Sequence, residues 1–172
     1  MVDLGGIGKG LSASRALLAM RDAWPELRGA LVDLGGDVAV RGQPPEGGPW
    51  RIAVADPRSP EVAVGILEVD DGAVATSGRT ARRFGPGRTR HHLIDPQTGA
   101  PAVAGPLSVT VVAQDAAWAE AHATALAISD PVDARAHVAA HPGDSALLVS
   151  DDGDLEPLGS FRFAPEPVEA VR

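Results

Sequence analysis

Residues 50–76, WRIAVADPRSPEVAVGILEVDDGAVAT, decide the fold class because they form three extended runs separated by turn signals. Residues 50–55 alternate apolar and polar side chains, the turn at 56–60 holds two prolines, and residues 62–69 alternate again. The sequence Asp70-Asp71-Gly72 is typical of a hairpin, and residues 73–76 continue as a strand. The stretch therefore predicts an antiparallel meander.

More strands and several helices are predicted on either side of this stretch. Short apolar runs bounded by turn residues predict strands over 30–32, 38–40, 91–94, 108–113 and 146–149, with Leu155 in a closing hairpin. Apolar spacing predicts helices over 9–23, over 116–128 with Asp115 as the cap, and over 131–140. Because strands and helices do not alternate strictly, we expect an α+β fold with an antiparallel or mixed sheet and flanking helices.

Length and composition are typical of one soluble globular domain. The chain has 172 residues, of which 44% are hydrophobic and 22% are charged. We assign residues 1–163 to the domain and 164–172 to a polar tail. The formal net charge of −8 argues against binding to nucleic acid or to anionic membranes. The absence of cysteine excludes disulfides, thiolate zinc sites and lipid-anchoring cysteines.

Three groups of residues are candidates for chemistry, and each has an ordinary structural alternative. The glycine-rich segment 3–10, DLGGIGKG, can bind a phosphate at a helix N-terminus with Lys9 adding charge, or it can be a plain turn. Glu120 and Thr124 share a helix face and can bind a hard cation, or they can be a solvated glutamate and a threonine bonded to its own helix. His91 and His92 point to opposite faces of the predicted strand, so only one of them can enter a site.

Two further groups are less informative. The arginines between residues 79 and 90 either attract phosphates or an acidic loop of a target, or lie on a solvated hairpin. His122, His137 and His141 lack an obvious ligand spacing, and we assign them no role.

The order of five segments resembles the ApbE family of flavin transferases. These segments are DLGGIGKG at 3–10, LGGD at 34–37, TSG at 76–78, HLIDPQTG at 92–99 and EAHATAL at 120–126. The resemblance extends from Asp3 to about Phe161 and implies a T-fold-like half of the family fold. It also implies FAD and Mg²⁺ as cofactors. The implied reaction transfers FMN from FAD to a threonine hydroxyl of an acceptor protein as a phosphoester and releases AMP.

The resemblance implies roles for individual residues. His92 is the expected catalytic residue, which helps to activate or position the acceptor threonine. The Gly6 carbonyl, Glu120 and Thr124 are the expected metal ligands, although the family has aspartate at the glutamate position. The residues expected to bind the cofactor are Gly5, Gly6, Lys9, Gly35, Gly36, Thr76, Ser77 and Gly78.

One departure from the family concerns its first lobe, which normally precedes the glycine-rich segment, whereas here Met1 stands almost on that segment. We therefore expect a truncated member, a second chain that replaces the lobe, or a remnant without catalysis. The competing hypotheses are an FMN transferase and a non-catalytic FAD- or nucleotide-binding module. A homodimer or other complex is expected to use Ile52, Val54, Val64 and Ile66, or the apolar face of residues 11–18. Without a leader or apolar span the chain reads as cytoplasmic, although the family is often anchored to membranes outside the cytoplasm.

Overall fold

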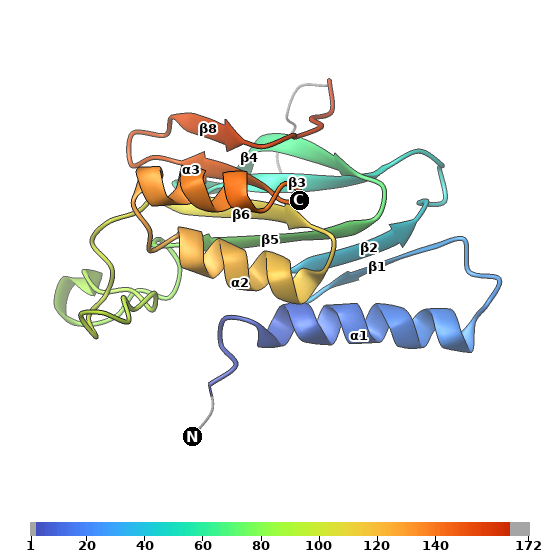
Figure 1. The fold of residues 1–172 in the computed structure, drawn as a ribbon, viewed down its shortest axis with the longest axis horizontal. Coiled ribbons are helices and arrows are strands. Elements are labelled where there is room, and N and C mark those ends of the chain that lie inside the picture. The colour runs from blue at the N-terminus through green and yellow to red at the C-terminus, as the bar shows by residue number, and fades with distance from the viewer. Residues whose placement is uncertain (1–2, 166–172) are drawn as a thin grey trace.

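The computed structural model describes residues 3–165 and contains a six-stranded main sheet. The strands in spatial order are β1 (Gly29–Asp33), β2 (Val38–Gly42), β5 (Gly72–Gly78), β6 (Ser108–Ala113), β7 (Ser145–Val149) and β8 (Leu155–Leu158). All neighbouring strands in this sheet are antiparallel. The helices α1 (Gly8–Ala23), α2 (Ala116–Leu126) and α3 (Pro131–Ala140) cover one face (Figure 1). The predicted α+β class is confirmed.

A separate hairpin covers the other face of the main sheet (Figure 1). It consists of β3 (Trp50–Asp56) and β4 (Ser59–Val69), which pair only with each other among the described strands. The predicted simple meander is therefore wrong, because β5 pairs with β2 and the hairpin leaves the sheet. The physical reason is that Val40, Val74 and Leu147 form an apolar second face that needs its own cover.

Residues 79–107 form an irregular connection that contains the short 3₁₀ helix η1 (Pro86–Arg88). The prediction of a strand over residues 91–94 is wrong, since only isolated bridges join Phe84 to Arg90 and Ile94 to Pro101 within this segment. The physical reason is that no neighbouring strand pairs with residues 91–94, and prolines at 86, 96, 101 and 106 interrupt the segment around them. The segment is a loop fixed by individual contacts.

The chain end beyond β8 stays close to the hairpin. The Arg162 carbonyl accepts a hydrogen bond from the Glu68 amide, and the Ala164 amide donates to the Ile66 carbonyl. Ala164 is the first residue of the predicted polar tail, and residues 166–172 of that tail lie outside the described residues.

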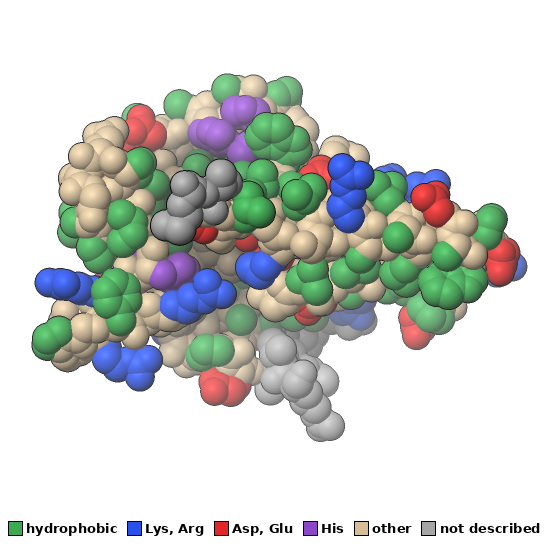
Figure 2. Space-filling model, turned by 90° about the horizontal axis from the view of Figure 1, so that it is seen from below, with side chains coloured by type: hydrophobic (Ala, Val, Ile, Leu, Met, Phe, Trp, Pro, Cys, Tyr) green, Lys and Arg blue, Asp and Glu red, His purple; other side chains and the backbone are tan. Residues whose placement is uncertain are grey.

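The two surfaces expected to meet a partner differ in exposure. Val54 is buried, and Ile52 and Val64 pack with it in the apolar cluster between the hairpin and the main sheet, so the expected use of these three side chains in an interface is wrong. Ile66 is half-buried outside this cluster, and its use in an interface stays a prediction. On α1, by contrast, Leu11 and Leu18 are 42% and 46% exposed. Figure 2 shows hydrophobic side chains in green along this helix. Within residues 3–165, no helix combines the length and apolar character that crossing a membrane requires.

Helices α1 and α2 approach most closely at Gly10, the third residue of α1. A Cβ atom at this position would lie 2.0 Å from the carbonyl oxygen of Ala116. We expect Gly10→Ala to lower the free energy of unfolding by about 3 kcal/mol, at the upper end of overpacking penalties, because the obstacle is backbone. Gly143→Ala is the matched control, since a Cβ there meets no atom within 4 Å. Equal urea denaturation midpoints for the two variants would contradict the close helix contact.

Candidate functional site

A cavity of about 660 Å³ lies at the N-terminus of α1, between the glycine-rich segment, the β1–β2 turn, the end of β5, α2 and the loop 79–107. Figure 2 shows it as a hollow with positively charged and histidine side chains on its rim. Its lining includes all expected site residues except one: Gly5, Gly6, Lys9, Gly35, Thr76, Ser77, Gly78, His92, Glu120 and Thr124. The exception is Gly36. The fold thus gathers segments that are more than 100 residues apart in sequence, from Gly6 to Glu120.

Glu120 is buried on α2 and faces the N-terminus of α1. Its side chain is only 3% exposed, and Oε2 accepts a hydrogen bond of 2.8 Å from the Gly10 amide. Burial raises the pKa of the Glu120 carboxyl, and the charge of Asp37 adds to this, while the Gly10 amide and Lys9 oppose it. The alternative of a solvated glutamate is therefore wrong. One carboxylate oxygen satisfies a helix-terminal amide, and the carboxyl group lines the cavity.

Lys9 joins the glycine-rich segment to the β1–β2 hairpin. Its Nζ lies 2.6 Å from Oδ2 of Asp37, whose side chain is only 2% exposed. One cation, Lys9, and two buried carboxylates, those of Asp37 and Glu120, therefore line the same cavity. Asp37 belongs to the LGGD segment, but the predicted site residues do not include it. A charged residue directly before the apolar strand 38–40 is the signal that points to it.

A second wall of the cavity is rich in hydroxyl groups. Oγ of Ser77 on β5 lies 3.1 Å from Oγ1 of Thr124 on α2. A Cβ atom at Gly6 would lie 3.5 Å from the Thr124 methyl carbon, so the glycine backbone lies beside this threonine. The Thr76 hydroxyl is instead bonded to Thr110 at 2.8 Å. The Ser77 and Thr124 hydroxyls therefore lie together, with the Gly6 backbone beside Thr124.

The two adjacent histidines have different environments. His92 lines the cavity, and partial burial lowers its pKa, with the charge of Arg82 as the next cause. An opposing hydrogen bond involves the Ala81 backbone. His91 is buried, and its Nε2–H donates to the Ala102 carbonyl at 2.9 Å. The lowered pKa of His92 favours its neutral imidazole form. The hydrogen bond of His91 fixes the loop.

Backbone turns shape the remaining rim. Gly35 and Gly36 adopt φ values of 67° and 92°, which favour glycine, and the Gly36 amide donates to Asp33 Oδ1. The Gln97 amide donates to Oδ1 of Asp95 at 2.8 Å, so the aspartate shapes its turn.

The predicted arginine stripe separates into different roles. Arg79 donates to the carbonyls of Gly105 and Pro106 and pairs with Asp151, so it braces the loop. Arg82 lines the cavity. Sequence reasoning treated them as equivalent because it had no information on which side chain the loop turns inward.

The segments singled out in the sequence thus converge on one cavity. The ApbE family profile matches residues 1–149, and the chain belongs to the ApbE family. Its relative from Escherichia coli K12, named FAD:protein FMN transferase, is 33% identical over 155 residues, which are 89% of this chain and 43% of the relative. A Rhodobacter capsulatus protein of the same name is 36% identical over 171 residues, which are 98% of this chain and 32% of that protein.

Solved structures agree with this assignment. The ApbE protein of Thermotoga maritima superposes with a TM-score of 0.81 at 35% identity, over 91% of this chain and 51% of that chain. The flavin transferase ApbE of Vibrio cholerae gives a TM-score of 0.71 at 30% identity, over 92% and 50%. The chain therefore spans about half of each of these solved chains and less of the two curated relatives.

Proposed function

We propose that this chain carries the catalytic half of a Mg²⁺-dependent FAD:protein FMN transferase. The observation that carries the proposal is the shared cavity of about 660 Å³, which gathers a helix N-terminus, oxygen donors and a neutral histidine. A helix N-terminus suits phosphate groups, and the names of the relatives supply FAD as the substrate and a protein as the acceptor.

The proposed reaction is a phosphoryl-type transfer to a threonine of the acceptor protein. The threonine Oγ forms a bond to the flavin-side phosphorus of FAD, the bridging P–O bond breaks, and AMP leaves. Nε2 or Nδ1 of His92 accepts the hydroxyl proton, for which a lowered pKa keeps the imidazole neutral at pH 7. The product is a phosphoester between FMN and threonine.

The cavity fits a magnesium ion by the chemistry of its donors. The Gly6 carbonyl, the Glu120 carboxylate and the Thr124 hydroxyl are all oxygen ligands, which Mg²⁺ prefers. Gly6 and Thr124 lie side by side, and Glu120 is buried on the same helix as Thr124. When bound, the ion would offset the charge of the pyrophosphate and of the leaving AMP.

FAD binding is expected to require magnesium, because the two phosphates would otherwise face the carboxylates of Asp37 and Glu120. Titration of the chain with FAD, followed by quenching of flavin fluorescence, should show weak binding in EDTA and full affinity after excess Mg²⁺ is restored. Riboflavin, which lacks phosphates, is the control ligand and should be indifferent to EDTA. If FAD bound with the same affinity in EDTA, the proposed magnesium ion would have no part in FAD binding.

The exposed leucines of α1 predict an association. Leu11 and Leu18 lie on one side of the helix, with Leu4 also 55% exposed ahead of it. We propose that a second copy of this chain covers this face. Sedimentation velocity at low micromolar concentration should show a dimer that Leu11→Glu converts to a monomer, whereas Val103→Glu, at a site 95% exposed, should have no effect. A monomeric wild-type chain would contradict this.

The reaction can be tested with a threonine-bearing acceptor domain, FAD and Mg²⁺. The expected result is a flavin-fluorescent acceptor band after denaturing electrophoresis, with the Vibrio cholerae transferase as the positive control. Magnesium-dependent FAD binding without any such band would favour the alternative of a non-catalytic FAD-binding module.

A further inference from the structure

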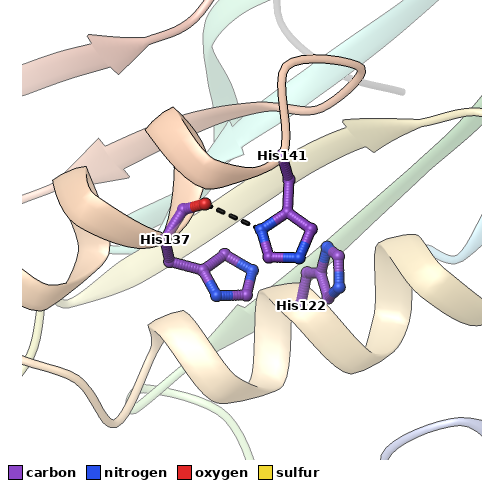
Figure 3. A group of neighbouring side chains, drawn as sticks. All are labelled: His122, His137 and His141. Carbon is purple, nitrogen blue, oxygen red and sulfur yellow. Dashed lines mark hydrogen bonds between the residues drawn. The ribbon is translucent and has the colours of Figure 1, made fainter.

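Three of the five histidines of the chain gather on the side of α2 away from the cavity. His122 lies on α2, His137 on α3, and His141 immediately after α3 (Figure 3). One ring nitrogen from each lies within 4.8 Å of the others. Since successive helical residues turn by roughly 100°, His122 lies on the opposite side of α2 from Glu120 and Thr124. The cluster is therefore separate from the proposed flavin site.

Two of the rings are oriented by hydrogen bonds to Nδ1. Nδ1–H of His122 donates to Oδ2 of Asp144 at 2.5 Å, and Nδ1–H of His141 donates to the His137 carbonyl at 2.8 Å (Figure 3). Because carboxylate and carbonyl oxygens only accept, both rings carry their proton on Nδ1 when neutral. Nε2 of each then holds a free lone pair. A bond of this kind to the distal nitrogen is the usual support of a metal-binding histidine.

The third ring lacks a partner. Nε2 of His137 is buried and has no hydrogen-bond partner among the described residues. Buried polar atoms are rarely left unsatisfied, so this nitrogen itself points to a missing ligand.

We propose that His122, His137 and His141 bind one divalent transition-metal ion, zinc being the natural occupant, with Asp144 fixing the His122 ring. Imidazole nitrogens suit zinc and other late transition metals, whereas the oxygen donors of the flavin cavity suit magnesium. Ligands of tetrahedral zinc lie roughly 3.4 Å apart, so modest side-chain rotations would bring the three nitrogens to one ion.

The surroundings leave a fourth ligand position accessible. A second cavity of about 380 Å³ is lined by His122, His141 and Asp144 on one side. Water can reach an ion from there. The bound ion would join α2, which carries Glu120 and Thr124, to the end of α3, and so stabilise the helix layer beneath the flavin site.

The test uses the untagged chain, freed of metal, with Zn²⁺ as the probe. Competition with a chromophoric chelator should reveal one equivalent bound with submicromolar affinity, and zinc should raise the thermal midpoint. His137→Ala and His141→Ala should each lower the affinity about 100-fold or more, while Asp144→Asn should lower it about 10- to 100-fold. Each variant should also lose the zinc-dependent rise in thermal midpoint.

The controls separate this site from the proposed flavin site, on which it does not depend. His92→Ala and Glu120→Gln should bind zinc like the wild type. His141 is exposed, so its variant should keep the metal-free circular dichroism spectrum and remain informative if the variant of the half-buried His137, His137→Ala, misfolds. Wild-type zinc affinity in His141→Ala and Asp144→Asn, or no one-to-one binding by the wild type, would overturn the proposal.

Discussion

Replacing His92 with alanine should lower the rate of flavin transfer by about 10²- to 10⁴-fold, the range for loss of a general base. The imidazole lines the cavity, and its lowered pKa keeps it neutral near pH 7. Only this neutral form accepts a proton. The rate should therefore fall as the pH drops through a value below 6.5, the ordinary pKa of histidine. Initial rates of acceptor fluorescence across pH values measure both effects.

A control for His92 must lie in the same loop but away from the cavity. Val103→Ala fits, because Val103 is 95% exposed and is not among the cavity-lining residues. His91 is unsuitable as a silent control, since it is buried and bonded to the Ala102 carbonyl. If His92→Ala transferred flavin at the wild-type rate, or if the rate of this variant fell at low pH as in the wild type, His92 would not be the general base.

Replacing Glu120 should separate its structural contact from its proposed metal contact. Glu120→Gln retains an oxygen that can accept from the Gly10 amide, so stability should change by less than about 1 kcal/mol. It removes the charge, and Mg²⁺-dependent FAD affinity should fall about 10²-fold, the scale for losing one partner of a buried charge interaction. Glu120→Ala should lose the same affinity and about 1–3 kcal/mol of stability as well.

The two Glu120 variants are compared by FAD titration in Mg²⁺ and by urea denaturation without FAD. If Glu120→Gln kept wild-type, magnesium-dependent affinity, Glu120 would serve only to bind the α1 terminus. If both variants lost stability equally, the Gly10 contact would not explain the burial of this side chain.

Local signals allowed much of the fold to be predicted. Asp115 was predicted as a cap, and its side chain accepts from the amides of Ala117 and Trp118. The helices and most strand positions follow from apolar spacing. The position of the β3–β4 hairpin could not be predicted in this way. Alternating apolar and polar residues indicate that one face of a strand is apolar, but they do not indicate which layer of the fold that face covers. Residues 91–94 were predicted as a strand because they form a short apolar run bounded by turn residues, yet no neighbouring strand pairs with them.

Site residues divide in the same way. Gly6, His92 and Thr124 were predicted from the segments that contain them, because the order of these segments can be read from the sequence alone. The ion pair of Lys9 and Asp37 depends on how α1 approaches the β1–β2 turn. The contact of Glu120 with Gly10 depends on how α1 approaches α2. No spacing encodes these distances.

The histidine cluster shows the limit most clearly. His137 on α3 and His141, the residue that caps the end of this helix, are four positions apart, which is a recognised ligand spacing. The third member, His122, comes from another helix and joins them only in the folded chain. A pair was visible in the sequence, and the triad was not.

The central claim is that this chain transfers FMN, and the mass of the acceptor tests it most directly. After incubation of the chain with FAD, Mg²⁺ and a threonine-bearing acceptor domain, intact-mass spectrometry should show an adduct of one FMN less one water, with one AMP released per adduct. An acceptor whose threonine is replaced by valine should remain unmodified. An acceptor of unchanged mass, under conditions in which the Vibrio cholerae transferase modifies it, would contradict the account.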